Sequence, residues 1–567
     1  MQPSSRDPAP SITLGTEPSP PSPPPGSNPS PVTSKPLTTR GLARSAGVIS
    51  LATMGSRILG LARDVVLAFF FGAGHAMDAY NIAYRIPNLL RDLFAEGAMS
   101  AAFVPTFTRY LTGRSRDEAW RLGNVVLNTL LAITLALVVA GMVFAGPLVG
   151  LLAGAYRAEP GKFELTVFLS RILMPFLTLV AVAAACMGML NALRRFFVPA
   201  LSPAMYNVGT IVTVLILVPV FTWLGIRPII AVAIGSLAGG LGQVAIQWPL
   251  LRREGFRYRF VLDWHDEGLR EVATLMLPAV IGLAAVQVNL MVNSFLAAGE
   301  GKGAVSWLQY AFRLMYMPIG LFGVSIATAV LPSISRHAAE SDFAALRGTL
   351  SNGLRTMLML NVPATAGLIA LAVPIVELLF QRGQFLPTDT AATAAAVVFY
   401  APGLVGYSAV KIAAPSFYAL RESRVPVMVS IATMLLNVVL NLALVRAIGF
   451  RGLALGTALA SIVNAVLLLW LLRRRIGGID GRRLAVAVAK ISVASAVMAG
   501  SAVWLENWLS TIIAGTSVLP RLLRLALAIG GAVAVLAAAA KVLRIREFDE
   551  ALRMVAGRLA RRGGQAA

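Results

Sequence analysis

"GNVVLNTLLAITLALVVAGMVFA", residues 123–145, contains no charged residue. As an α-helix it would extend about 34 Å, enough to cross the roughly 30 Å hydrocarbon core of a bilayer. Similar runs cover 428–446, 453–472 and 484–504 in a chain of 567 residues that is 57% hydrophobic and only 13% charged. About a quarter of the residues of a soluble protein are charged. The sequence therefore predicts an all-α integral membrane protein with about fourteen transmembrane helices.

The net charge of +23 is concentrated in alternate loops. Basic residues cluster at 109–121, 252–259 and 473–483, whereas 72–77 has none and 299–303 has one lysine. Lys and Arg accumulate on the cytoplasmic side of membrane proteins. We therefore expect an even number of spans with both termini cytoplasmic, and we attribute the basicity to topology and not to nucleic-acid binding.

Prolines in matching contexts reveal an internal repeat. Pro105 in "VPTFTRY" and Pro332 in "LPSISRH" differ by 332 − 105 = 227 positions. The same offset relates Pro147 to Pro374, Pro175 to Pro402 and Pro199 to Pro426. Six helices per copy is an even number, so the two copies would be parallel repeats related by an axis along the membrane normal, with a substrate site between them.

The repeat divides the chain into five expected parts. Residues 1–40 are Pro/Ser-rich and lack the apolar core of a signal peptide, so we expect a disordered cytoplasmic tail. The copies form an N-lobe at 41–260 and a C-lobe at 261–478. Two further helices lie within 479–545, and 546–567 is a basic cytoplasmic tail.

The two copies differ in the charged residues of their first two helices. Charges that only one copy carries are not required for the shared fold. The first helix of copy one, residues 48–72, carries Arg57, Arg63 and Asp64, while its counterpart at 277–299 carries no ion. The second helix has five ions between 78 and 96, while 304–332 keeps only Arg313. The fold therefore does not require most of these charges.

Eight ions facing lipid would cost on the order of 20 kcal/mol, more than a typical folding free energy. They should therefore face water or one another. At 100° per residue, one arc of the second helix collects Asp78, Asn81, Arg85, Asn88, Asp92 and Glu96. This stripe predicts a wet cavity wall, although Pro87 should kink the helix. The alternative is that Arg57 and Arg63 snorkel and the other ions form internal pairs that only hold helices together.

Arginines in a membrane cavity favour an anionic, phosphorylated substrate, because guanidinium groups bind phosphate oxygens bidentately and stay charged. The chain has no GxxxxGK[ST] loop, so we expect transport driven by membrane potential or an ion gradient and not by ATP hydrolysis. Its three histidines lie far apart in sequence and show no metal-ligand spacing. We expect neither a cofactor nor a metal.

"SRILGLARDVVLAFFFGAG", "DAYNIAYRIPNLLRDLFAEGAMSAAFVP", "VSWLQYAFRLMYMPIG" and "LPSISR" together resemble the MurJ/MviN family of lipid II flippases, within the multidrug/oligosaccharidyl-lipid/polysaccharide exporter superfamily. The likeness covers about residues 42–545. It implies two six-helix lobes, a cationic central cavity, and a groove at the last two helices for a polyprenyl tail.

The resemblance also implies roles for individual residues. Substrate contacts fall on Arg57, Arg91 and Arg313, and gating or ion-pair roles fall on Arg63, Asp78 and Glu96. From their charge and helical spacing we add Asp64 and Arg85 to the gating or ion-pair group, and we expect a polar cavity wall at Asn81, Asn88 and Asp92. Two positions depart from the family pattern. Asp92 stands where a second basic residue is frequent, and Phe312 stands where an acidic one is.

The resemblance implies a transporter and not an enzyme, located in the bacterial cytoplasmic membrane. It would move the undecaprenyl-pyrophosphate-linked peptidoglycan precursor, lipid II, between leaflets by alternating access. Its partners would be lipid II, the membrane and the cell-wall synthesis machinery, with the monomer as the functional unit. The alternatives are an exporter of another anionic lipid-linked glycan or of a drug, and a membrane-embedded glycosyl- or phosphotransferase.

Overall fold

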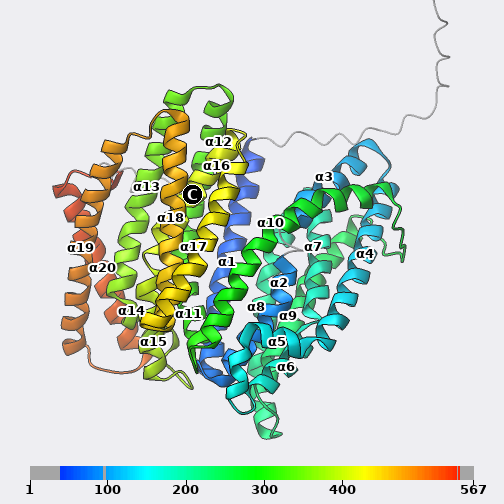
Figure 1. The fold of residues 1–567 in the computed structure, drawn as a ribbon, viewed down its shortest axis with the longest axis horizontal. Helices are drawn as coiled ribbons and strands as arrows, with labels where there is room; N and C mark the ends of the chain where they lie inside the picture. The colour runs from blue at the N-terminus through cyan, green and yellow to red at the C-terminus, as the bar shows by residue number, and fades with distance from the viewer. Residues whose placement is uncertain (1–38, 93–97, 546, 549–567) are drawn as a thin grey trace, which may run out of the picture. The chain divides into compact units, whose positions relative to one another are not determined.

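The computed structural model describes residues 39–92, 98–545 and 547–548, and every regular element among them is helical (Figure 1). The chain divides into two contact units, Met1–Gly47 and Val48–Ala567. Helix α1 (Thr39–Phe71) crosses the boundary between them. The arrangement discussed below is that of the second unit, which contains both sequence repeats.

The helix bounds reproduce the internal repeat. Helix α4 (Arg116–Val143) recurs as α13 (Phe343–Ala370), displaced by 227 residues at both ends. The short helix that follows each of them recurs at the same offset, α5 (Ala145–Ala153) as α14 (Ala372–Phe380). The remaining helices of copy one are α2 (His75–Arg91), α3 (Ala98–Gly113), α6 (Lys162–Leu173), α7 (Phe176–Ala192), α8 (Phe197–Trp223) and α9 (Ile230–Arg253).

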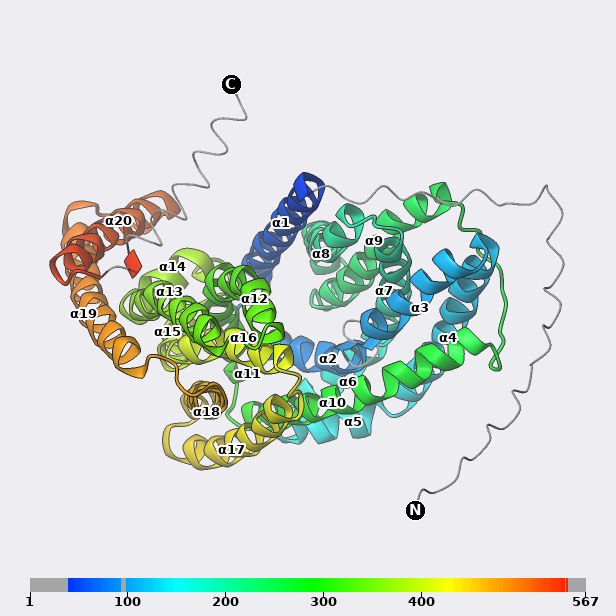
Figure 2. The same cartoon turned by 90° about the horizontal axis from the view of Figure 1, so that it is seen from above.

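Copy two has the corresponding order. It contains α10 (Glu267–Ala298), α11 (Ala304–Pro318), a π-helical turn η3 (Ile319–Gly323), α12 (Val324–Ala339), α15 (Pro387–Tyr400), α16 (Gly403–Ala419), α17 (Arg424–Ile448) and α18 (Phe450–Ile476). Helices α19 (Gly481–Ile512) and α20 (Val518–Val542) follow outside the repeat and pair with each other beside α13 and α14 (Figure 2). The expected all-helical architecture, a duplicated unit followed by two further helices, is confirmed.

Nine helices among the described residues are long and apolar enough to cross a membrane, or up to eleven if each of two bent pairs counts as one span. The bends are 74° between α13 and α14 and 43° between α15 and α16. Helices α1, α2, α3, α5 and α10 fall outside this set, so the count of about fourteen spans stays a prediction.

The basic loops of copy one meet at one end of the N-lobe. Arg195 Nε lies 2.8 Å from a Glu254 carboxylate oxygen, and Arg121 Nη2 lies 3.0 Å from Asp263 Oδ2. These pairs join loops that lie far apart in sequence, as expected if alternate loops share one membrane face. Asp266 caps α10 by accepting hydrogen bonds from the backbone N–H groups of Gly268 and Leu269.

Helix α10 connects the lobes diagonally, because it packs on α3 in the N-lobe and on α17 in the C-lobe (Figure 1). Helix α2 continues through Pro87 to Arg91. One buried apolar cluster contains side chains from both repeats, among them Tyr80 of α2 and Tyr310 of α11. The lobes are thus in direct contact where α2 and α11 begin.

Candidate functional site

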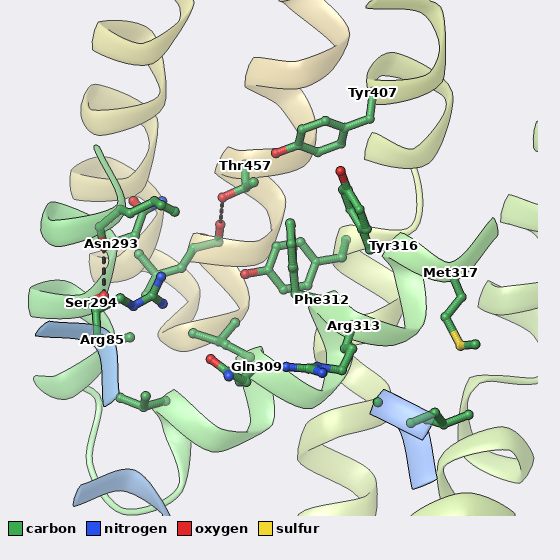
Figure 3. A pocket seen from close by; sticks show the side chains of 18 of the residues that line it. Arg85, Asn293, Ser294, Gln309, Phe312, Arg313, Tyr316, Met317, Tyr407 and Thr457 are labelled. Atoms are coloured by element: carbon green, nitrogen blue, oxygen red, sulfur yellow. Dashed lines mark hydrogen bonds between the residues drawn. The ribbon is translucent and has the colours of Figure 1, made fainter. Parts of the chain in front are cut away.

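A cavity of about 590 Å³ lies between the two repeats. Its walls come from α1, α2 and α8 of copy one and from α10, α11, α15, α16 and α18 of copy two. Three arginines line it, Arg57, Arg85 and Arg313. Figure 3 shows Gln309, Phe312, Arg313 and Tyr316 projecting from α11, with the Arg85 side chain approaching on the side of Asn293 and Ser294.

A second cavity of about 330 Å³ adjoins the first on the N-lobe side. Both are lined by Ser56, Arg85, Asn207, Gln309 and Arg313. The second cavity adds Arg63 and Arg91, and its exposed lining is mainly polar. Together the two cavities are lined by five arginines and, among the described residues, by no carboxylate.

Asp64 balances two of these arginines from behind the cavity wall. Its Oδ1 lies 2.9 Å from Arg63 Nη2, and its Oδ2 lies 2.7 Å from Arg313 Nε. Arg63 is buried and stacks over the Tyr206 ring at 5.1 Å. The Asp64–Arg313 pair also connects α1 to α11, so it links copy one to copy two.

Arg57 and Arg85 have no carboxylate within ion-pairing distance in the described part of the chain. The Arg57 guanidinium rests on the backbone of the π-helical turn, since a Cβ placed on Gly320 would lie 1.3 Å from Arg57 Nη1. A side chain at position 320 would therefore have to push the end of the flexible Arg57 side chain aside. These two guanidinium groups are therefore the cavity's unbalanced positive charges.

Arg91 and Asp92 form a pair at the end of α2. Arg91 Nη2 lies 2.8 Å from Asp92 Oδ1, and Gln287 of α10 donates a hydrogen bond of 3.4 Å to Asp92 Oδ2. Arg91 lines the smaller cavity, whereas Asp92 does not. Asp92 therefore orients Arg91 from outside the cavity, which gives this departure from the family pattern a structural account. Glu96 lies outside the described residues.

Asp78 does not line either cavity. It is fully buried and accepts hydrogen bonds from Gly303 N at 2.7 Å, from Ser306 N at 3.1 Å and from Ser306 Oγ at 2.7 Å. Lys162 of α6 pairs with it at 3.2 Å. Because Asp78 belongs to α2 and Ser306 to α11, this contact holds the lobes together at one end of the cavities. We call it the Asp78 contact.

The polar stripe of α2 therefore divides into three parts. Asp78 makes the interlobe contact; Asn81, Arg85 and Asn88 line the smaller cavity; and Asp92 pairs with its neighbour. Asn81 also donates a hydrogen bond of 3.1 Å to Ser306 Oγ. The expectation that the whole stripe forms one continuous cavity wall is therefore wrong, because Asp78 and Asp92 are taken up by protein partners and line neither cavity.

The sequence reasoning missed a polar and aromatic face on α11. Gln309, Phe312, Arg313 and Tyr316 recur at spacings of three and four, so they share one side of a helix. Phe312 stacks on Tyr316 with ring centroids 5.8 Å apart, and it meets the edge of Tyr400 at 5.5 Å. The comparison of the two copies considered only charged residues, so it did not detect this mostly uncharged face.

Among the described residues, no group of three or more His, Cys, Asp or Glu side chains could hold a metal.

Comparison with known proteins identifies relatives over most of the chain. The family model described as "Lipid II flippase MurJ" matches residues 67–523. A probable lipid II flippase MurJ from Vibrio cholerae is 36% identical over 485 residues, covering 83% of this chain and 91% of that protein. The lipid II flippase MurJ of Burkholderia cenocepacia is 33% identical, covering 76% and 84%.

Solved structures agree with this assignment. A lipid II flippase MurJ in an inward closed conformation is 27% identical, covers 87% of this chain and 99% of its own, and superimposes with a TM-score of 0.71. An inward-facing multidrug transporter of the MATE family is 17% identical with a TM-score of 0.63, which indicates a common fold. With a family model and relatives that match it over most of its length, the chain belongs to the lipid II flippase MurJ family.

Proposed function

We propose that this protein moves lipid II between the leaflets of the bacterial cytoplasmic membrane, with the arginine-lined cavities holding the pyrophosphate and sugar head group. The observation that supports binding of this head group in the cavities is their positive charge. Five arginines face them, no carboxylate does among the described residues, and Arg57 and Arg85 lack an ion-pair partner there. An anionic ligand would supply the missing negative charge.

The aromatic face of α11 supports a mixed head group. Phe312 and Tyr316 of α11, together with Tyr400 of α15 and Tyr407 of α16, line the larger cavity and not the smaller one. Aromatic rings provide rigid apolar surface with a polar edge, which suits the alternating apolar and hydroxyl surfaces of a sugar. We infer that pyrophosphate lies toward Arg57, Arg85 and Arg91, with the sugars toward the aromatic face.

Alternating access would proceed by opening and closing the lobes around these cavities. The Asp78 contact and the Asp64–Arg313 pair cross between copies and would break and re-form in each cycle. With both termini cytoplasmic, the Asp78 contact lies on the periplasmic side, so this state would be closed toward the periplasm. Membrane potential or an ion gradient would drive the cycle, and the monomer would be the working unit alongside the cell-wall synthesis machinery.

Depletion of the protein distinguishes this function from the alternatives. We expect lipid II to accumulate in the inner leaflet, because synthesis continues while translocation stops. Loss of lipid II with normal amounts of its soluble precursors would instead indicate a glycosyl- or phosphotransferase. Normal lipid II distribution with accumulation of a different lipid-linked glycan would indicate another exporter.

Arginine variants test the role of the cavities. We expect Arg57→Ala, Arg91→Ala and Arg313→Ala each to abolish complementation of a depletion strain while the protein still reaches the membrane in normal amounts. The matched control is Arg171→Ala, since Arg171 is exposed on α6 and lines neither cavity. Full complementation by all three cavity variants would leave only a structural role for these arginines.

A further inference from the structure

A third cavity, of about 550 Å³, lies away from the central site, where the break between α13 and α14 meets the end of α19 and the start of α20. Four ionisable side chains line it, Glu377, Glu506, Arg521 and Arg524. The proposed transport mechanism does not use these four side chains. Figure 2 shows α19 and α20 beside α13 and α14, on the side of the C-lobe away from copy one.

The charges in this cavity are only partly satisfied by one another. Arg521 Nη2 pairs with Glu377 Oε1 at 3.0 Å, but Arg524 Nε lies 3.9 Å from Glu506 Oε1, too far for a hydrogen bond. Glu506 Oε2 and the Nε atoms of Arg521 and Arg524 are buried without a hydrogen-bond partner in the described part of the chain. One carboxylate oxygen and two guanidinium nitrogens of the residues that line this cavity therefore lack a hydrogen-bond partner in the described part of the chain.

The position of this cavity relative to lipid follows from two tryptophans on α19. Trp504 and Trp508 are 64% and 50% exposed, and their rings stack with centroids 6.0 Å apart. They flank Glu506 in sequence, and exposed tryptophans concentrate at the depth of the lipid head groups. Val373 and Val503, which line the cavity, are also exposed, so its mouth opens on the lipid-facing surface.

We propose that this cavity binds the head group of a phospholipid that carries both a phosphate and a primary ammonium, as in a phosphoethanolamine head group. Arg524 and Arg521 would donate to the phosphate oxygens, and Glu506 would accept from the ammonium. A ligand with phosphate alone would place its negative charge beside two carboxylates. A ligand with both charges matches both halves of the cavity.

Head-group chemistry gives a test that needs no variant. The full-length protein, delipidated in detergent, is titrated with phosphatidylethanolamine, phosphatidylcholine and phosphatidylglycerol of identical acyl chains, and bound lipid is counted by native mass spectrometry. The trimethylammonium of phosphatidylcholine has no N–H donor, and phosphatidylglycerol has no amine. We expect about tenfold tighter binding of phosphatidylethanolamine, the ratio that follows from one charge-assisted hydrogen bond.

Variants of the cavity residues then test whether the preference for phosphatidylethanolamine arises at this cavity. Glu506→Gln should reduce the tenfold preference to roughly equal binding of the three lipids, and Arg524→Gln should weaken binding of all three. The control is Arg446→Gln, because Arg446 is exposed at the end of α17, on the same side of the protein as the end of α19. This control should keep the preference. Four outcomes would each overturn the proposal: equal binding of the three lipids by the unmodified protein, tightest binding of phosphatidylglycerol, an unchanged preference in Glu506→Gln, or undiminished binding in Arg524→Gln.

Discussion

Replacing Ser306 by alanine should weaken the Asp78 contact without disturbing either lobe. The substitution removes the hydrogen bond of 2.7 Å from Ser306 Oγ to Asp78 and the bond of 3.1 Å from Asn81 to Ser306 Oγ. Both cross between copies, whereas the Asp78–Lys162 pair lies within copy one and remains. Ser306→Ala therefore acts on the interlobe contact specifically.

The size of the effect can be worked from these two bonds. A hydrogen bond to a charged group contributes about 1.5–3 kcal/mol, and one between neutral groups about 0.5–1.5 kcal/mol. Their combined loss is at least about 2 kcal/mol. If opening the lobes exposes these groups to water, the open fraction should rise by about 30-fold, because 1.4 kcal/mol corresponds to a factor of ten.

A single reporter cysteine can measure this fraction. Ala304 is fully buried at the start of α11, so Ala304→Cys in a Cys186→Ala background reacts with a bulky maleimide only when the lobes separate. The labelling rate of purified protein is proportional to the open fraction even when that fraction is small. We expect Ser306→Ala to raise this rate by about 30-fold.

The matched control is Ser170→Ala. Ser170 is as buried as Ser306, but its Oγ bonds to Thr166 O at 2.7 Å within α6. The control should leave the labelling rate within about twofold. An unchanged rate in Ser306→Ala, or an equal rise in both variants, would refute the assignment of the Asp78 contact as a closure of the lobes.

Two glycine substitutions test other close approaches. Gly320→Ala should displace the guanidinium end of Arg57, since the new Cβ would lie 1.3 Å from its Nη1. Complementation should fall, but less than in Arg57→Ala, because the displaced arginine keeps its charge. Gly348→Ala, whose Cβ would have nothing within 4 Å, should complement fully. Gly239→Ala would put a Cβ 2.5 Å from the backbone of α8. We therefore expect calorimetry to show a Tm lowered by several degrees. A loss of 1 kcal/mol in the free energy of unfolding corresponds to about 2–4 °C in domains of 150–250 residues. Gly242→Ala, whose nearest contact would be an ordinary 3.5 Å, should change Tm by less than half as much, and equal losses would contradict the packing argument.

The internal repeat was predictable because the positions of prolines and the lengths of apolar segments can be read directly from the sequence. The offset of 227 residues read from Pro105 and Pro332 reappears in the bounds of α4 and α13. The contrast between copies likewise identified the helices that carry the cavity arginines. Each of these conclusions needs only the order of residues along the chain and no knowledge of how the helices pack.

The partners of the charges were not predictable in the same way. Asp64 lies beside Arg63 in sequence, but its pairing with Arg313 depends on how α1 meets α11. Helical periodicity placed Asp78 and Asn88 on one face, yet one makes an interlobe contact and the other lines a cavity. Periodicity gives the direction of a side chain and not the element that it meets.

The sequence alone determined that this is a duplicated helical membrane protein whose first copy keeps costly charges, because bilayer thickness and the cost of ions in lipid act on each segment separately. Only the tertiary structure decided which charges are neutralised. Arg63, Arg91 and Arg313 have carboxylate partners, while Arg57 and Arg85 face the cavity unpaired in the described part of the chain. Arg63 and Arg91 pair with the residue that follows each of them, but the Arg313–Asp64 pair joins α11 to α1 and exists only because the lobes pack together.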